Sequence, residues 1–111
     1  MSRNMERRIR ERVLLRCPLR LYRRGSGTPI EGETRNLSSA GFYCVARTGF
    51  EPGESLDCIL TVPAEKVSMD TGNVNLHCEV LVTRVDERNS EYGIACRIDH
   101  YSLILRSDPH T

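Results

Sequence analysis

The residues best suited to bind a charged ligand are arginines at the start of the chain. The first 24 residues hold nine arginines, no lysine and two acids, whereas the rest of the chain carries thirteen acidic and seven basic side chains. A guanidinium is planar and can grip a phosphate or the edge of a base with two parallel hydrogen bonds, which an ammonium cannot do. Arg7, Arg8 and Arg12 lie just before the first predicted strand, and Arg8 and Arg12 have the spacing R-x-x-x-R. This head predicts a site for a polyanionic ligand.

A second group of polar residues follows some two dozen positions later. The segment from Asn36 to Gly41 has the pattern N-x-S-x-x-G, with Ser38 at its third position. The Asn36 amide oxygen can accept a hydrogen bond, the Ser38 hydroxyl can bind a phosphate or a base, and Gly41 allows the backbone to turn or to approach closely. Each motif alone is weak evidence, because arginines four apart recur in this head and Asn and Ser are common in turns.

The elements that must position these residues are strands. Apolar and polar residues alternate with period two, which predicts strands at 13–22, 30–35, 42–46, 56–62, 74–85 and 92–98. Pro18 is expected to place the first strand at a sheet edge or a bulge, and residues 36–41 form a tight connection. The sequence leaves room for at most one short helix, at residues 101–106. Short strands separated by turn signals indicate an all-β fold, either a sandwich or a small barrel.

The five cysteines all fall on the apolar phase of a predicted strand. They are Cys17, Cys44, Cys58, Cys78 and Cys96. Buried cysteine acts as a small hydrophobic side chain, so these residues are expected to fill the core. The odd count and the absence of a C-x-x-C pair argue against a disulfide framework or a metal site, and favour the cytoplasm as the compartment.

Several classes of protein fit the sequence poorly. No carboxylate pair or nucleophile-elbow pattern suggests catalysis, so we do not expect an enzyme. His77 falls on the outward phase of its strand and has no Cys or His partner at ligand spacing. The apolar runs are too short to span a membrane, and no apolar segment follows the basic head as in a secretory signal.

Taken together, the two motifs in this order resemble those of the PilZ domain family, bacterial receptors for cyclic di-GMP. The Gly53 turn and the run Tyr92-Gly93-Ile94-Ala95-Cys96 are also similar to family features. The resemblance implies a six-stranded antiparallel β-barrel, with at most a short C-terminal helix. The expected organisation is a flexible Arg-rich arm at 1–12, a barrel domain at 13–106 and a tail at 107–111.

The resemblance also implies a ligand site. Cyclic di-GMP would contact six residues: Arg7, Arg8, Arg12, Asn36, Ser38 and Gly41. The arginines would share the phosphates and the O6 and N7 atoms of guanine, and Asn36 would accept from the guanine Watson–Crick edge. Binding would order the arm, which would then signal to a protein partner. Arg7, just before the R-x-x-x-R, favours an intercalated ligand dimer over a single molecule.

Two other functions stay open at this point. One is a PilZ-like adaptor for a pilus or motility machine that binds no nucleotide. The other is an Arg-arm nucleic-acid binder, which the acidic body and the lack of tryptophan disfavour. Arginines outside the two motifs, such as Arg88, are expected to be dispensable for binding.

Overall fold

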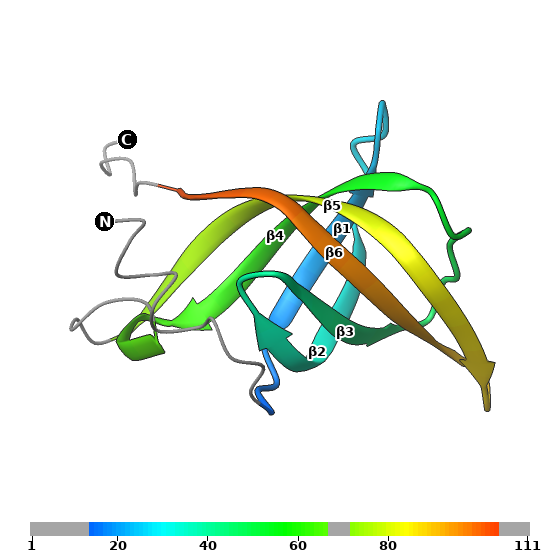
Figure 1. The fold of residues 1–111 in the computed structure, drawn as a ribbon, viewed down its shortest axis with the longest axis horizontal. Coiled ribbons are helices and arrows are strands. Elements are labelled where there is room, and N and C mark those ends of the chain that lie inside the picture. The colour runs from blue at the N-terminus through cyan, green and yellow to red at the C-terminus, as the bar shows by residue number, and fades with distance from the viewer. Residues whose placement is uncertain (1–13, 67–71, 105–111) are drawn as a thin grey trace.

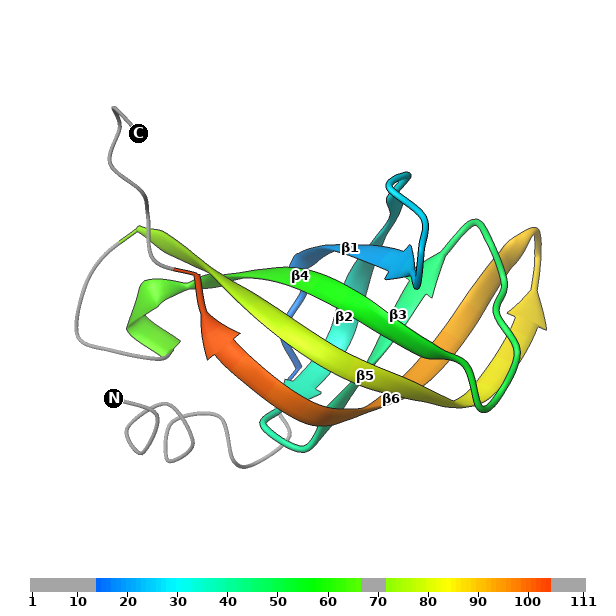
Figure 2. The ribbon, with the colours of Figure 1, turned by 90° about the horizontal axis from the view of Figure 1, so that it is seen from above.

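The protein is a closed antiparallel barrel of six strands, in the spatial order β1-β2-β3-β6-β5-β4. This computed structural model describes residues 14–66 and 72–104. The elements are β1 (Pro18–Arg23), β2 (Ile30–Ser38), β3 (Gly41–Ala46), β4 (Ser55–Pro63), η1 (Ala64–Lys66), β5 (Asn73–Arg88) and β6 (Glu91–Leu103). Figures 1 and 2 show the strands wrapped around one interior, with the long β5–β6 hairpin extending beyond the shorter strands. The predicted all-β barrel is confirmed.

One expectation about the strands is wrong, and one question that the sequence left open is answered. Pro18 does not mark a sheet edge, because β1 pairs with both β2 and β4; Pro18 is the first residue of its strand, where a missing N–H is tolerated. Residues Tyr101–Leu103 are not helical but continue β6, held by pairing with β5 from Cys78 to Leu76. The expected arm and tail, and residues 105–106, lie outside the described residues.

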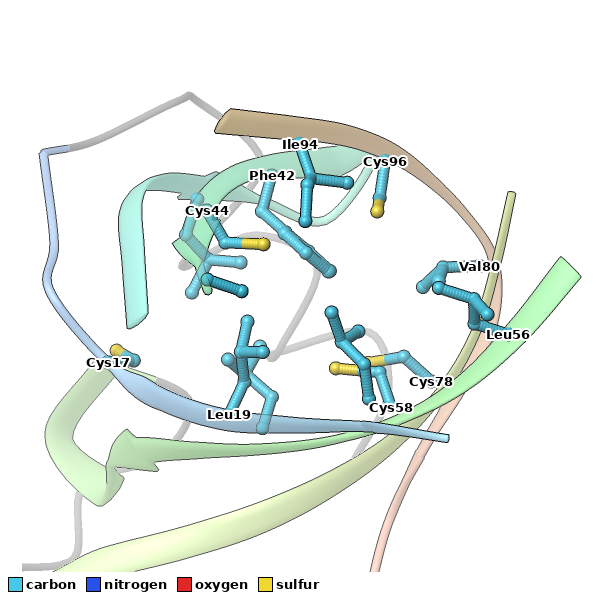
Figure 3. Close-up of a cluster of buried hydrophobic side chains, with 14 of the residues drawn as sticks. Cys17, Leu19, Phe42, Cys44, Leu56, Cys58, Cys78, Val80, Ile94 and Cys96 are labelled. Carbon is cyan, nitrogen blue, oxygen red and sulfur yellow. The ribbon is translucent and has the colours of Figure 1, made fainter. Parts of the chain in front are cut away.

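The interior of the barrel is filled with side chains. All five cysteines are buried with free thiols, as their strand phase predicts. In Figure 3, Phe42, Cys44, Ile94 and Cys96 point toward Leu19, Cys58 and Cys78 from the opposite wall. Burial raises the pKa of Cys78 and Cys96 to about 12 and also raises that of Cys58. These thiols therefore stay protonated and unreactive at neutral pH. Because side chains fill the interior, any ligand site must lie on the outer surface of the barrel.

A buried threonine joins the start of the described chain to β2. The Thr34 side chain is fully buried, and its hydroxyl donates to the Leu15 carbonyl at 2.5 Å and accepts from the Cys17 amide at 2.8 Å. The Thr34 amide in turn donates to the Cys17 carbonyl at 2.9 Å. The segment before β1 is therefore fixed beside β2, two residues before Asn36.

Replacing Thr34 by valine removes the two hydroxyl contacts, keeps the backbone bond to Cys17 and leaves the side-chain volume nearly unchanged. We expect Thr34→Val to lower the free energy of unfolding by about 1–3 kcal/mol, because it leaves the Cys17 amide buried without its acceptor. Urea unfolding measures the effect. Thr61→Val is the matched control, since the Thr61 hydroxyl bonds to Asn75 at an exposed position. Equal destabilisation by the two substitutions would contradict the structural role of the Thr34 hydroxyl.

Candidate ligand-binding site

The N-x-S-x-x-G motif forms the end of β2, a two-residue turn and the start of β3. Ser38 and Gly41 are register partners across this turn. The Ser38 side chain is only 3% exposed. Its hydroxyl accepts from the Ala40 amide at 3.1 Å and donates to the Gly41 carbonyl at 3.3 Å. Ser38 therefore closes the turn, which is the local bonding typical of such a sequence.

Gly41 is required by a close approach between strands. A Cβ at this position would lie 2.4 Å from the Cys96 carbonyl oxygen of β6. The neighbouring Ala40 carbonyl accepts from the Ile98 amide at 2.8 Å, so the turn is held against β6. Of the two roles that the sequence allows for this glycine, the structure shows close approach.

A β-bulge sets the direction of Asn36. The pairing of β2 with β3 shifts between Thr34 and Asn36, which leaves Arg35 as an extra residue. Thr34 and Leu37 both point into the core, so Arg35 and Asn36 lie together on the outer face. Arg35 forms an ion pair with Glu33, and Asn36 lines a groove.

This groove runs across the outer face of β2, β3, β6 and β5. Its volume is about 700 Å³. One row of register partners crosses it: Asn36, Tyr43, Ala95 and Arg84. Three strand spacings separate the ends of the row, about 14 Å along the sheet. Over β6 the groove is lined by the small Ala95 and by Arg97.

Arginines gather along the groove. Arg84, Arg88 and Arg97 line it. The Arg84 Nε lies 3.6 Å from an Asp86 carboxylate oxygen, and the Arg97 Nε donates to Asp99 at 2.7 Å, which holds the pKa of Asp99 below its usual range. Arg88 forms no ion pair with any residue in the described ranges, and it also lines a second groove of about 330 Å³ beside Arg35. These cations suit an anionic ligand.

The structure brings only part of the predicted site into view. Asn36 and Gly41 line one corner of the groove, whereas Ser38 is buried in the adjoining turn and does not line it. Arg7, Arg8 and Arg12 lie outside the described residues. The sequence reasoning missed Tyr43, Arg84 and Arg88 as groove residues. The outward phase of β3 could have indicated Tyr43, but a second bulge at Thr83 reverses the phase of β5 before Arg84.

The described residues show no group of three His, Cys, Asp or Glu side chains that could hold a metal ion. Within the same ranges, none of the helical structure is long and apolar enough to cross a bilayer.

Comparison with known families agrees with this geometry. The PilZ domain matches residues 3–108, nearly the whole chain. The chain belongs to the PilZ domain family. PilZ domains are cyclic di-GMP-binding or adaptor domains rather than enzymes.

Among solved structures, the Bacillus subtilis inhibitor of motility, MotI/DgrA, has the same fold. It shares 19% sequence identity with this PilZ domain, with a TM-score of 0.63 over 82% of the chain. The match spans 42% of the neighbour's length, so this chain corresponds to less than half of that protein. No curated protein matches the sequence.

The close contact at Gly41 allows a direct test of how tightly the turn between β2 and β3 packs against β6. We expect Gly41→Ala to destabilise the PilZ domain by about 1–3 kcal/mol, because the added Cβ meets backbone atoms of β6 that cannot move independently. Thermal or urea unfolding measures the change. Gly27→Ala is the control, since a Cβ there meets nothing within 4 Å, and it should stay within about 0.5 kcal/mol of the parent. A neutral Gly41→Ala would contradict the tight packing of the turn against β6.

Proposed function

We propose that this PilZ domain is a receptor for cyclic di-GMP. The observation that carries the proposal is the position of Asn36. The bulge at Arg35 turns Asn36 outward at the end of an arginine-lined groove, beside the segment that Thr34 fixes to β2. We propose that the two motifs, separated in sequence, meet on this face. Leu15 is three residues after Arg12, a span of at most about 10 Å.

The proposed contacts divide the ligand by its chemistry. The Asn36 amide oxygen accepts from the N1–H or N2–H of a guanine, while Ser38 and Gly41 hold the turn that aims it. Arg7, Arg8 and Arg12 bind phosphates and the O6 and N7 acceptors of guanine, and a guanidinium can also stack on a base. Arginine suits all these tasks, whereas lysine suits only the phosphates.

Ligand binding is proposed to act through the arm. The ligand phosphates neutralise the arginines and hold the arm across the groove, and the ordered arm then presents a surface to a protein partner. Ordering costs free energy, so the affinity reflects the ligand contacts minus that cost. The ligand is either one molecule or an intercalated dimer, and Arg7 before the R-x-x-x-R favours the dimer.

A nucleotide-independent adaptor is the second candidate function. The observation in its favour is the Ser38 hydroxyl, whose hydrogen bonds lie within its own turn. A sequence could keep Ser38 and Gly41 for packing reasons alone. This candidate does not explain the outward Asn36 or the arginine head, and we therefore prefer the receptor.

The head arginines give the sharpest test of the receptor. We expect Arg8→Ala and Arg12→Ala each to weaken cyclic di-GMP binding by at least tenfold, since a charged hydrogen-bond partner contributes about 1.5–3 kcal/mol. Isothermal titration calorimetry measures both affinity and stoichiometry. Arg20→Ala is the control, because Arg20 belongs to the same head but lies exposed on β1, away from the groove.

One result would change the list of contact residues, and two would count against cyclic di-GMP binding as the function. Full binding by Arg12→Ala would remove that residue from the site. No heat and no amide shift with cyclic di-GMP in the parent protein would favour the adaptor. RNA binding that cyclic di-GMP does not displace, with a steep dependence on salt, would favour the nucleic-acid binder.

A substitution at Asn36 is expected to strengthen cyclic di-GMP binding rather than weaken it. A carboxylate accepts a stronger hydrogen bond than an amide, so we expect Asn36→Asp to tighten cyclic di-GMP binding by about fivefold, or ~1 kcal/mol. The same titration measures it, with Asn75→Asp on β5, outside the groove, as the control. Unchanged affinity in Asn36→Asp would show that this side chain does not meet a base.

A further inference from the structure

The groove has a second hydrogen-bond acceptor, on the β5 side opposite Asn36. Asp86 lies on β5 and lines the groove, in the row next to that of Asn36. The Tyr43 hydroxyl donates to its Oδ2 at 3.4 Å, and the Arg84 Nε lies 3.6 Å from the same oxygen. Both contacts are longer than a normal hydrogen bond. The Asp86 Oδ1 has no hydrogen bond to any described residue. The carboxylate can therefore still accept two strong hydrogen bonds from a ligand.

The Tyr43 ring forms the floor between the two acceptors. It starts on β3 and crosses β6 at Gly93, where a Cβ would lie 1.7 Å from the Tyr43 hydroxyl oxygen. The ring can reach Asp86 only because this position is glycine. The Arg84 guanidinium lies 5.8 Å from the ring centroid. The guanidinium thus lies over the ring in a loose cation–π contact, and both planar groups are of the kind on which a nucleotide base stacks.

The chemistry of Asp86 selects among bases. A carboxylate only accepts hydrogen bonds and can accept two in parallel. The Watson–Crick edge of guanine offers two adjacent donors, N1–H and N2–H, which match such a pair. Adenine has one donor and one acceptor on this edge, so its N1 would face a carboxylate oxygen without a proton between them. The nearby Arg84, Arg88 and Arg97 offset the repulsion between Asp86 and ligand phosphates.

We propose that Asp86 and Tyr43 form a second guanine subsite of this domain. Asn36 reads one guanine, whereas Asp86 reads another through its N1–H and N2–H donors, and Tyr43 supports the base from below. The inference rests on the proposed cyclic di-GMP function and extends it, since it assigns base selectivity to a residue outside both sequence motifs.

The test compares two ligands on the full chain. One is cyclic di-GMP, and the other is the mixed cyclic dinucleotide with one guanine and one adenine. The parent protein should bind the mixed ligand about 5- to 150-fold more weakly, because one base loses its paired contact. Asp86→Asn should weaken cyclic di-GMP binding by a similar factor. It should keep or improve binding of the mixed ligand, because a carboxamide offers adenine one donor and one acceptor. The affinity ratio therefore falls toward one.

Asp57→Asn is the matched control. Asp57 lies on β4, outside the groove, and its Oδ2 is 3.6 Å from the Arg24 Nε, the same separation as in the Asp86–Arg84 pair. It should keep the parental ratio. Asp86→Asn with a parental melting temperature and an unchanged ratio, or with equal loss of both ligands, would overturn the second subsite alone. A parent protein that binds neither ligand would overturn the proposed function and the subsite together.

Discussion

The hydroxyl of Thr34 is the interaction on which the arrangement of the site depends. It joins Leu15 and Cys17, just before β1, to the middle of β2. A threonine is unusual at a fully buried position, and here its polar atom is satisfied by two backbone groups that would otherwise lack partners in the core. Because Asn36 follows Thr34 by two residues, the same contacts hold Leu15 and Cys17 beside the strand that carries the N-x-S-x-x-G motif.

The outer groove follows from the packing of the interior. A six-stranded barrel of this size has no room inside for a ligand, since Phe42, the leucines and the cysteines fill it. The outer surface must therefore provide any concave site. It does so where β6 carries Gly93 and Ala95 outward, so that Tyr43 can lie across the strand toward β5. The raised thiol pKa values fit the same division of roles, because the cysteines belong to the packed interior and take no part in the outer chemistry.

The charged side chains, like the groove, lie on the outer surface of the barrel and are unevenly distributed over it. The arginine head contrasts with an acidic body, yet within the body the groove collects Arg84, Arg88 and Arg97 on one face. Two of these guanidiniums lie near a carboxylate two residues away: Arg97 donates a hydrogen bond to Asp99 at 2.7 Å, whereas Arg84 lies 3.6 Å from Asp86, beyond hydrogen-bond distance. Such pairs at an exposed surface contribute little to stability, but they keep the guanidiniums oriented. Arg88, expected from sequence to be dispensable, lies in the groove without such a partner in the described chain.

The sequence by itself determined which residues face inward, because burial on one side of a strand imposes period two. That pattern was enough to predict the all-β fold and the five core cysteines, whereas the two motifs were recognised from residue types and their spacing. It could not place the bulges at Arg35 and Thr83, since a bulge depends on the register of a partner strand distant in the chain. Tertiary pairing alone turned Asn36 outward, set Gly41 against Cys96, extended β6 through Leu103 and aligned Asn36 with Tyr43 and Arg84. The periodicity of a strand indicates which residues lie on each of its two faces. Which side chains contact one another depends on the register with the neighbouring strands.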